Sequence, residues 1–321
     1  MKITETLKKT RNVIRFKQLS LQTEKAYLYW IRYYCRWVPA HPAGTSEDKC
    51  RGFLTHLAAR RNVAASTQRQ ALNALVFLYR EVIGTALGDI GDFAKTARGS
   101  RLPVVLDQTE VQAILGAMHG IHWLTASLLY GAGLRMAECL SLRIKDIDLN
   151  RRQIFIRAGK GNKDRITLLP PSLATALQAQ IASVERQHQR DLADGYGEVY
   201  LPNAIARKYP NAAKATAWQY LIPSTTIGAC PRTGVLRRHH LHPSAFTKAL
   251  RAAKTKAGIK KHFTAHAFRH SFFFFNDTAT TDIYTVQKLL GHSDIRTTEV
   301  YLHLRKDMIS TTASPLEAIR A

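Results

Sequence analysis

The chain lacks several features by which common protein classes are recognised. Its four cysteines, Cys35, Cys50, Cys139 and Cys230, are scattered and form no C-x-x-C pair, which argues against a zinc knuckle and against a disulfide framework. The sequence has no run of about 20 apolar residues that could span a membrane, and its N-terminus carries no apolar signal core. These absences favour a cytoplasmic protein with no membrane partner.

Acidic residues are also scarce. The 23 Asp and Glu residues are outnumbered by 47 Lys and Arg residues, which gives a formal net charge of +24. Such an excess is either neutralised by a polyanion or tolerated as self-repulsion, so the composition favours a nucleic-acid partner, with a membrane surface as the alternative. The 321 residues are enough for about two domains of ~150 residues each.

The N-terminal part of the chain is predicted to be a small helical bundle. Residues 1–15 are basic and weakly patterned. Ser20 is placed to cap a helix in which apolar residues recur at intervals of three and four up to Pro39. A second helix is predicted over residues 47–60 and a third over residues 66–83.

Lys and Arg residues on the outer faces of this bundle would form a basic clamp that contacts mainly the phosphates of a nucleic-acid duplex. A helical domain with solvated lysines is the alternative. The stretch from Asp89 to Leu102 has little periodicity and reads as a linker. We therefore divide the chain into domains at residues 1–90 and 104–321, joined by a linker at residues 91–103.

The second domain opens with clear helical signals. Asp107 and Glu110 form a predicted capping box. A buried helix is predicted over residues 123–130, and two glycines end it just before Arg135. Glycine permits close backbone approach, so Arg135 is held in place, and its planar guanidinium can bind two phosphate oxygens at once.

A β-hairpin is predicted next. Residues 153–157 and 165–169 each alternate apolar and polar side chains, and the Gly-rich turn between them carries Lys160 and Lys163. A lysine at such a turn is usually only solvated.

The last third of the chain carries the most informative residues. His266 and Arg269 are spaced to share one face of a helix, His292 follows a glycine, and Tyr301 lies beyond it. These groups suit the task of holding a phosphodiester while a phenol attacks it. For the first two residues alone, a solvated helix face is the simpler interpretation.

Taken in order, the candidate residues form a more specific pattern, namely Arg135, Lys160, His266, Arg269, His292 and Tyr301. This ordered set resembles the active site of the tyrosine recombinase (phage integrase) family, which contains Arg, Lys, His, Arg, His or Trp, and a nucleophilic Tyr. All six positions match, and the resemblance extends over nearly the whole chain.

The resemblance implies both a fold and a mechanism. The expected fold is mainly α with a small β-sheet, in which an N-terminal helical core-binding (SAM-like) domain precedes an α+β catalytic domain. Tyr301 would form a 3′-phosphotyrosyl link to DNA while Lys160, or its neighbour Lys163, protonates the leaving 5′ hydroxyl. The arginines would neutralise the transition state and the histidines would donate hydrogen bonds, with no cofactor or metal. A homotetramer on DNA is also implied.

A stretch over about residues 189–245 is not required by a minimal catalytic core. Its aromatic, proline and histidine residues interleave with basic ones, a composition suited to stacking on unpaired bases. It resembles the additional segment of integron integrases, which contacts extrahelical bases of a folded single-stranded site, and Trp218, His239 and His240 are the candidate base contacts. A metal site at His239, His240 and His242 is the weaker interpretation, because these histidines lack established ligand spacing.

One segment departs from the family pattern. Residues Phe272 to Thr285 place four consecutive phenylalanines before Asn, Asp and Thr residues that form helices poorly. They resemble a translated sequencing-adapter read, and our hypothesis is that they are foreign to the natural protein. If they are authentic, exposed aromatic surface predicts poor stability.

Two other functions remain open. One is a recombinase that acts only on duplex sites, as a phage integrase or Xer-like enzyme does; the aromatic insert argues against it. The other is a DNA-binding protein whose catalysis is impaired by the anomalous segment. The resemblance favours an integron integrase that inserts and excises gene cassettes in the bacterial nucleoid, using folded attC hairpins and an attI site.

Overall fold

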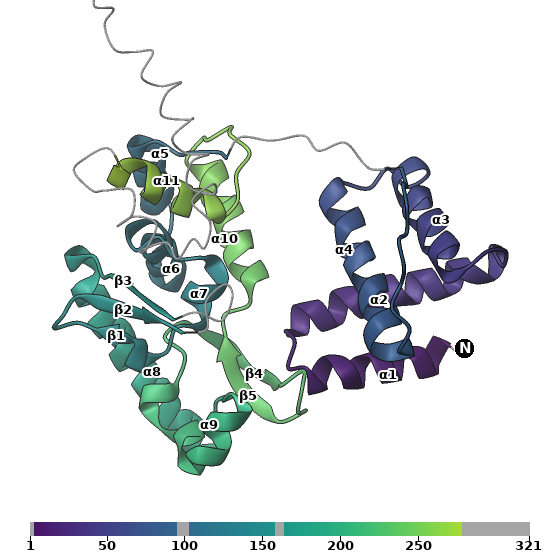
Figure 1. Ribbon diagram of the computed structural model, residues 1–321. Coiled ribbons are helices and arrows are strands. Elements are labelled where there is room, and N and C mark those ends of the chain that lie inside the picture. Colours follow the sequence, from purple (N-terminus) through teal and green to yellow (C-terminus); the bar gives the residue numbers. More distant parts are fainter. Residues whose placement is uncertain (1–2, 95–102, 158–163, 278–321) are drawn as a thin grey trace, which may run out of the picture. The chain divides into compact units, whose positions relative to one another are not determined.

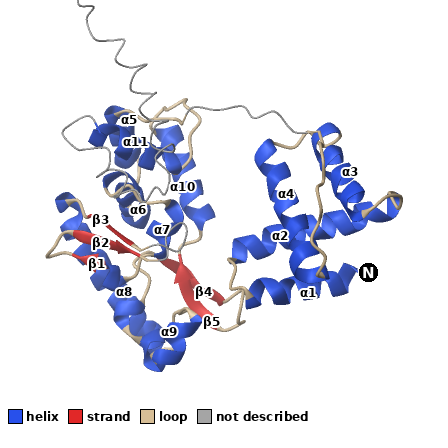
Figure 2. Cartoon of the chain, viewed as in Figure 1, coloured by secondary structure: helices blue, strands red, loops and turns tan. Residues whose placement is uncertain are grey.

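The computed structural model describes residues 3–94, 103–157 and 164–277. The chain forms two compact units, Met1–Arg101 and Leu102–Ala321, and the described part of each is mostly helical (Figure 1). The described strands all belong to the second unit, where Figure 2 shows them in two small separate sheets. The predicted fold class, mainly α with a small β-sheet, is confirmed.

The first unit is built from helices, with one short π-helical segment. Its elements are α1 (Ile3–Phe16), α2 (Leu21–Trp37), the 3₁₀ turn η1 (Val38–Ala40), α3 (Ser46–Ala59), α4 (Ala65–Phe77) and the π-helix η2 (Leu78–Ile83). The three predicted helices correspond to α2, α3 and α4 with η2, within one or two residues at most ends. Their apolar faces meet in one core around Phe53 and Leu75, both fully buried.

Helix α1 forms from the N-terminal stretch whose sequence is only weakly patterned. Its buried positions are Thr6, Thr10 and Ile14, spaced four apart as on one helix face. Two of the three are threonines, so the apolar pattern is weak in the sequence. The Thr10 hydroxyl donates to the Thr6 carbonyl oxygen at 2.8 Å, which satisfies it inside the helix.

Capping residues set the helix starts that the sequence predicted. The Ser20 hydroxyl accepts from the Thr23 backbone N–H at 3.0 Å at the start of α2. In the second unit, Asp107 and Glu110 form the predicted reciprocal pair, with bonds of 2.8 and 2.9 Å. Each cap satisfies backbone donors that a helix start leaves without partners inside the helix.

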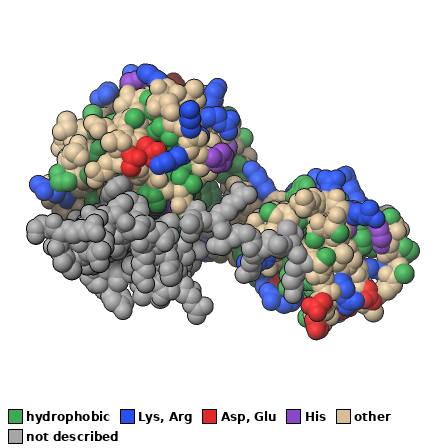
Figure 3. All heavy atoms as spheres, turned by 90° about the horizontal axis from the view of Figure 1, so that it is seen from above, with side chains coloured by type: hydrophobic (Ala, Val, Ile, Leu, Met, Phe, Trp, Pro, Cys, Tyr) green, Lys and Arg blue, Asp and Glu red, His purple; other side chains and the backbone are tan. Residues whose placement is uncertain are grey.

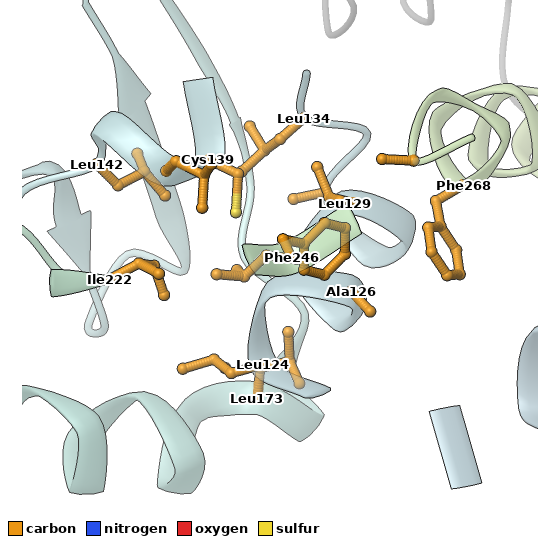
Figure 4. Packing of buried hydrophobic residues seen from close by; sticks show 14 of the residues in the cluster. Leu124, Ala126, Leu129, Leu134, Cys139, Leu142, Leu173, Ile222, Phe246 and Phe268 are labelled. Carbon is orange, nitrogen blue, oxygen red and sulfur yellow. The ribbon is translucent and has the colours of Figure 1, made fainter. Parts of the chain in front are cut away.

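The second unit has a larger core. Its helices are α5 (Gln108–Gly116), α6 (Gly120–Gly131), α7 (Met136–Ser141), α8 (Ala174–Ala193), α9 (Asn203–Lys208), α10 (Pro243–Lys256) and α11 (His266–Asp277), with 3₁₀ turns η3 (Ile144–Asp146), η4 (Pro171–Leu173), η5 (Pro210–Lys214) and η6 (Thr216–Trp218). Figure 4 shows Phe246 of α10 packed close to Leu129 of α6, with Phe268 of α11 also in the cluster. The core therefore fixes α11 against the α6–α7 region.

The two sheets are antiparallel. Strands β1 (Ile147–Asp148), β2 (Gln153–Ile156) and β3 (Arg165–Leu168) form one sheet in the order β1-β2-β3. Strands β2 and β3 are the two predicted strands. A second sheet pairs β4 (Pro223–Ala229) with β5 (Leu236–His240), inside the stretch where the sequence predicted only an irregular insert. The expected insert limits, 189 and 245, fall within α8 and α10.

The anomalous segment begins inside α11. This helix continues to Asp277, and Phe272 and Phe273 are 4% and 1% exposed. At least these two phenylalanines are therefore accommodated in the fold. Residues 278–285 of the segment lie outside the described residues, as does the C-terminal tail, so the hypothesis of a foreign origin stays a prediction.

The positive charge of the composition is visible on the described surface. Lysine and arginine side chains lie on both units, and acidic side chains occur in small groups (Figure 3). No described helix combines the length and apolar character needed to cross a bilayer.

Candidate active site

The junction between α6 and α7 presents Arg135. Helix α6 ends at Gly131, and Gly133 has a φ of +62°, a conformation that favours glycine. Arg135 then takes an extended backbone conformation directly before α7. Its backbone N–H donates to Glu138 Oε2 at 2.8 Å and its Nη1 donates to Glu138 Oε1 at 2.7 Å. Glu138 thus caps α7 and orients the Arg135 side chain.

Helix α11 brings Arg269 to the same place. Arg269 is 3% exposed, and its Nη1 donates to the Gly133 carbonyl oxygen at 2.6 Å. The same nitrogen lies 3.9 Å from Glu138 Oε2. Packing of α11 on α6, which Figure 1 shows beside α7, therefore joins two predicted catalytic arginines that are far apart in sequence.

His266 lies at the start of α11 and remains exposed. Its pKa is lowered from the ordinary value by partial desolvation and by the nearby positive charges of Arg269 and Arg135, against a smaller opposing effect of Glu138. A lowered pKa keeps the imidazole neutral at pH 7. A neutral ring can donate one hydrogen bond to a phosphate oxygen or accept a proton.

Arg165, at the start of β3, was not predicted. Its Nη1 and Nη2 donate to the two oxygens of Glu138 at 2.8 and 2.6 Å. The alternation in the sequence did not reveal it, because residues two apart in a strand share a face and the pattern would bury Ile166, which is 47% exposed. Thr167 is 1% exposed and donates to the Ala132 carbonyl oxygen, so Arg165 lies on the face of β3 that packs on the α6–α7 junction.

Positive charges outnumber negative charges in this cluster. Burial would raise the pKa of the Glu138 carboxyl, but hydrogen bonds from Arg165 and from the Arg135 backbone lower it to about 2. One carboxylate therefore stays ionised among three guanidinium groups. The surplus of positive charge, partly shielded from water, is suited to a phosphodiester.

The other half of the predicted catalytic set is outside the described residues. Lys160 and its competitor Lys163 belong to residues 158–163, and His292 and Tyr301 to residues 278–321. The structure brings Arg135 and Arg269 together and places His266 on the same helix as Arg269. Among the described residues, no group of three or more His, Cys, Asp or Glu side chains is arranged to hold a metal ion.

The structure divides the three predicted base contacts between two places. His239 and His240 lie on β5, with ring centroids 4.3 Å apart, and both contact the buried Tyr220 ring at 5.1 and 5.3 Å. Burial and the neighbouring His240 charge lower the pKa of His239 to about 4. Trp218 is half-buried, and Lys145 Nζ lies 2.9 Å from the centre of its ring.

Arg143 connects these two places, and sequence reasoning missed it. Its Nη1 donates to the Trp218 carbonyl oxygen at 2.5 Å and its Nη2 to the Tyr200 carbonyl oxygen at 2.8 Å. The guanidinium also lies 4.6 Å from the centre of the Tyr220 ring. Because Arg143 follows α7 closely, the insert is fixed to the same short segment that carries Arg135.

Two family matches cover most of the chain. Residues 104–308 match the phage integrase family, and residues 6–89 match the phage integrase N-terminal SAM-like domain. The chain belongs to the phage integrase family. Its members are tyrosine recombinases, so the protein is a DNA recombinase of this class.

Curated relatives agree with this assignment over the full length. An integrase/recombinase from Escherichia coli is 42% identical over 320 residues, covering 99% of this chain and 95% of the relative. The tyrosine recombinase XerA from Thermococcus kodakarensis is 29% identical, covering 94% of this chain and 93% of the relative.

Solved structures share the fold. XerH bound to a palindromic difH substrate in a post-cleavage complex has a TM-score of 0.62 at 19% identity, covering 95% of this chain and 83% of XerH. The Tn1549 transposon integrase in complex with transposon right end DNA has a TM-score of 0.59 at 14% identity, covering 96% and 99%.

Proposed function

We propose that this recombinase is an integron integrase, which inserts and excises gene cassettes by cutting and rejoining DNA through a 3′-phosphotyrosyl intermediate. Its substrates would be a folded single-stranded attC hairpin and an attI site. The proposal places the protein in the bacterial cytoplasm, at the nucleoid, and as a homotetramer on DNA. Solved relatives of the same fold were captured with DNA, which supports DNA as the partner.

The observation that carries the proposal is the insert cluster of Tyr220, His239 and His240. His239 and His240 lie on β5 and Tyr220 lies just before β4, and the three rings contact one another. The lowered pKa values of both histidines favour neutral imidazoles, which stack on bases without a competing charge. Aromatic surface of this kind suits an unpaired base, since every base has a face that can stack.

In this proposal Tyr301 attacks the scissile phosphate and Lys160 protonates the departing 5′ oxygen. Arg135 and Arg269 hold the phosphate oxygens, while His266 and His292 donate hydrogen bonds or assist proton transfer. One phosphodiester replaces another, so the chemistry requires neither a metal nor a nucleotide. Tyr301→Phe should leave DNA binding intact and abolish the covalent adduct.

A duplex-only, Xer-like enzyme is the second candidate. The observation that favours it is the position of Lys145, whose ammonium covers the Trp218 ring. A base could stack on that face only after the lysine moves. Xer recombinases are also among the curated relatives.

Covalent trapping on nicked suicide substrates separates the candidates. A folded hairpin with extrahelical bases is compared with its perfectly paired duplex. Adduct mainly on the hairpin is expected for an integron integrase, whereas adduct mainly on the duplex would replace that proposal with the Xer-like one. If neither forms an adduct, family-like residues are restored at Phe272 to Thr285. Recovery would then identify that segment as the cause of impaired catalysis.

A further inference from the structure

Arg165 lies beside the predicted catalytic arginines and has no role in the mechanism above. Its side chain is 10% exposed, and both of its Nη atoms donate to Glu138. Each Glu138 oxygen therefore receives one donor from Arg165 and one from Arg135, which supplies Nη1 to Oε1 and its backbone N–H to Oε2. The carboxylate has four acceptor positions at most, and these four bonds fill them.

This sharing limits the number of hydrogen bonds that Glu138 can accept from the Arg135 guanidinium. A guanidinium has five N–H donors and readily forms a two-bond pair with a carboxylate. Arg135 gives Glu138 only one guanidinium nitrogen, because its own backbone N–H and the two Nη atoms of Arg165 occupy the other three positions. Without Arg165, Glu138 could take a two-bond pair from Arg135 or attract Arg269, whose Nη1 already lies 3.9 Å away.

We propose that Arg165 is a positioning residue for DNA cleavage: by occupying both oxygens of Glu138, it prevents the carboxylate from drawing the guanidinium groups of Arg135 and Arg269 away from the scissile phosphate. The proposal rests on the catalytic role proposed for these two arginines. It does not depend on whether the substrate is a hairpin or a duplex.

The test is a double-mutant cycle of Arg165 and Glu138. DNA binding is measured at equilibrium, and every variant also carries Tyr301→Phe so that no cleavage occurs. Dissociation constants are compared for DNA with a normal scissile phosphate and for DNA with an uncharged methylphosphonate there. The dissociation constant for the methylphosphonate DNA, divided by that for the normal DNA, reports how strongly the arginines bind that phosphate. Arg165→Gln is expected to reduce this ratio by about 10-fold or more, by analogy with the 10–100-fold losses seen when residues that orient metal ligands are removed.

If Arg165 acts through Glu138, replacing Arg165 should have little effect once Glu138 has been replaced. In a Glu138→Gln background, Arg165→Gln should change the ratio by less than about threefold, because residues in one network have non-additive effects. An equal loss in both backgrounds would mean that Arg165 contacts DNA itself and would overturn the proposal. No loss in either background would also overturn it.

Control variants separate positioning from charge and from folding. Arg157→Gln removes the same charge from the neighbouring strand end, where the 52% exposed Arg157 pairs with Asp146 at 2.8 Å, and should leave the ratio unchanged. Arg165→Lys keeps the charge but not the two-pronged contact, so full recovery by lysine would contradict the proposal. Circular dichroism confirms that each variant is folded.

The failure of the proposed function gives a different pattern. If Arg135→Ala and Arg269→Ala leave the ratio unchanged, these residues do not hold the scissile phosphate, and the proposed active site is wrong. If Arg135→Ala and Arg269→Ala abolish the preference for the charged phosphate over the methylphosphonate while Arg165→Gln does not, only the role of Arg165 is refuted. Where cleavage is measurable, the single-turnover rate on the suicide substrate should fall in parallel with the ratio.

Discussion

Two buried carboxylates in the second unit are held by arginine in different ways. Asp191 of α8 has one arginine partner: Nε and Nη2 of Arg238 donate to it at 2.6 and 2.8 Å, and the third nitrogen, Nη1, donates to the Ser224 carbonyl oxygen. Glu138 instead has three arginines within 4 Å, namely Arg135, Arg165 and Arg269.

The difference is one of charge balance. At Asp191 one positive charge meets one negative charge, and every nitrogen of the Arg238 guanidinium bonds within the fold, so the pair fixes the β4–β5 hairpin to α8. At Glu138 a single negative charge is surrounded by three positive ones. A surplus of this kind is costly in an empty protein and is offset when an anion binds. A buried ion pair alone therefore does not identify a site; at Glu138 the surplus of positive charge is the feature that suits a bound anion.

The largest effect is expected from Arg238→Ala. This change leaves Asp191 buried without its partner, and breaking a buried pair in this way costs about 3–5 kcal/mol of stability. Urea denaturation of the full chain measures the loss. A cost below about 1 kcal/mol would show that Asp191 is not held as a structural pair and would remove one side of the comparison.

The matched change on the other side is Arg135→Ala. Cleavage on a suicide substrate should slow by about 10²–10³-fold, as for other donors that stabilise a transition-state oxyanion. Overall DNA affinity should change much less, because many phosphate contacts contribute to it. Single-turnover rates and gel-shift affinities check both statements. If a folded Arg238→Ala protein lost cleavage to the same extent, the balanced and unbalanced clusters would not differ in function.

Acid should weaken the Glu138 cluster. The pKa of Glu138 is about 2 in the folded chain against an ordinary value of 4.5, so its ionised form stabilises the fold above about pH 5, and this contribution is lost as the pH falls toward 2. The contribution is on the order of 3 kcal/mol. Unfolding free energies between pH 6 and pH 3 should therefore fall less steeply for Glu138→Gln than for the unmodified chain. Parallel pH curves would contradict the assignment.

The aromatic part of the insert should matter only for extrahelical bases. Removing a stacking side chain costs about 1–3 kcal/mol per base, so Trp218→Ala should weaken hairpin binding by about 5- to 150-fold and leave duplex binding nearly unchanged. Fluorescence anisotropy with the two DNA forms measures both. Equal losses on hairpin and duplex would argue that Trp218 supports the fold through Arg143 and Lys145 instead.

The smallest effect is expected from Arg157→Gln. Its partner Asp146 is buried, but Arg157 itself is 52% exposed, and pairs with such solvent access contribute about 0–1 kcal/mol. Urea denaturation should detect little change. A cost comparable to that of Arg238→Ala would mean that solvent access of the arginine is not what separates strong from weak pairs in this chain.

Local sequence signals predicted much of the fold. The capping residues Ser20 and Asp107 and the alternation in β2 and β3 act through neighbours a few residues away, so a pattern of residue types is sufficient to recognise them. Helix α1 was not recognised in the sequence because two of its three buried positions are threonine. The β4–β5 hairpin escaped because its strands carry glycine, proline and charged residues in place of a clear alternation.

The candidate site was predictable only in part. The order of Arg135, His266 and Arg269 is a family pattern and can be found in the sequence. Their meeting at Glu138 depends on how α11 packs on α6. The partner of Glu138 could be inferred only by knowing which face of β3 is buried.

By itself the sequence determined the basic charge, the helical class, the capped helix starts and the ordered set of candidate residues, because each is a property of composition or of short spacing. The tertiary structure decided which charges meet. Arg165 reaches Glu138 across 27 residues of chain, and Arg143 reaches Trp218 across 75. Contacts over such separations depend on the packing of whole helices and strands, which no local pattern specifies.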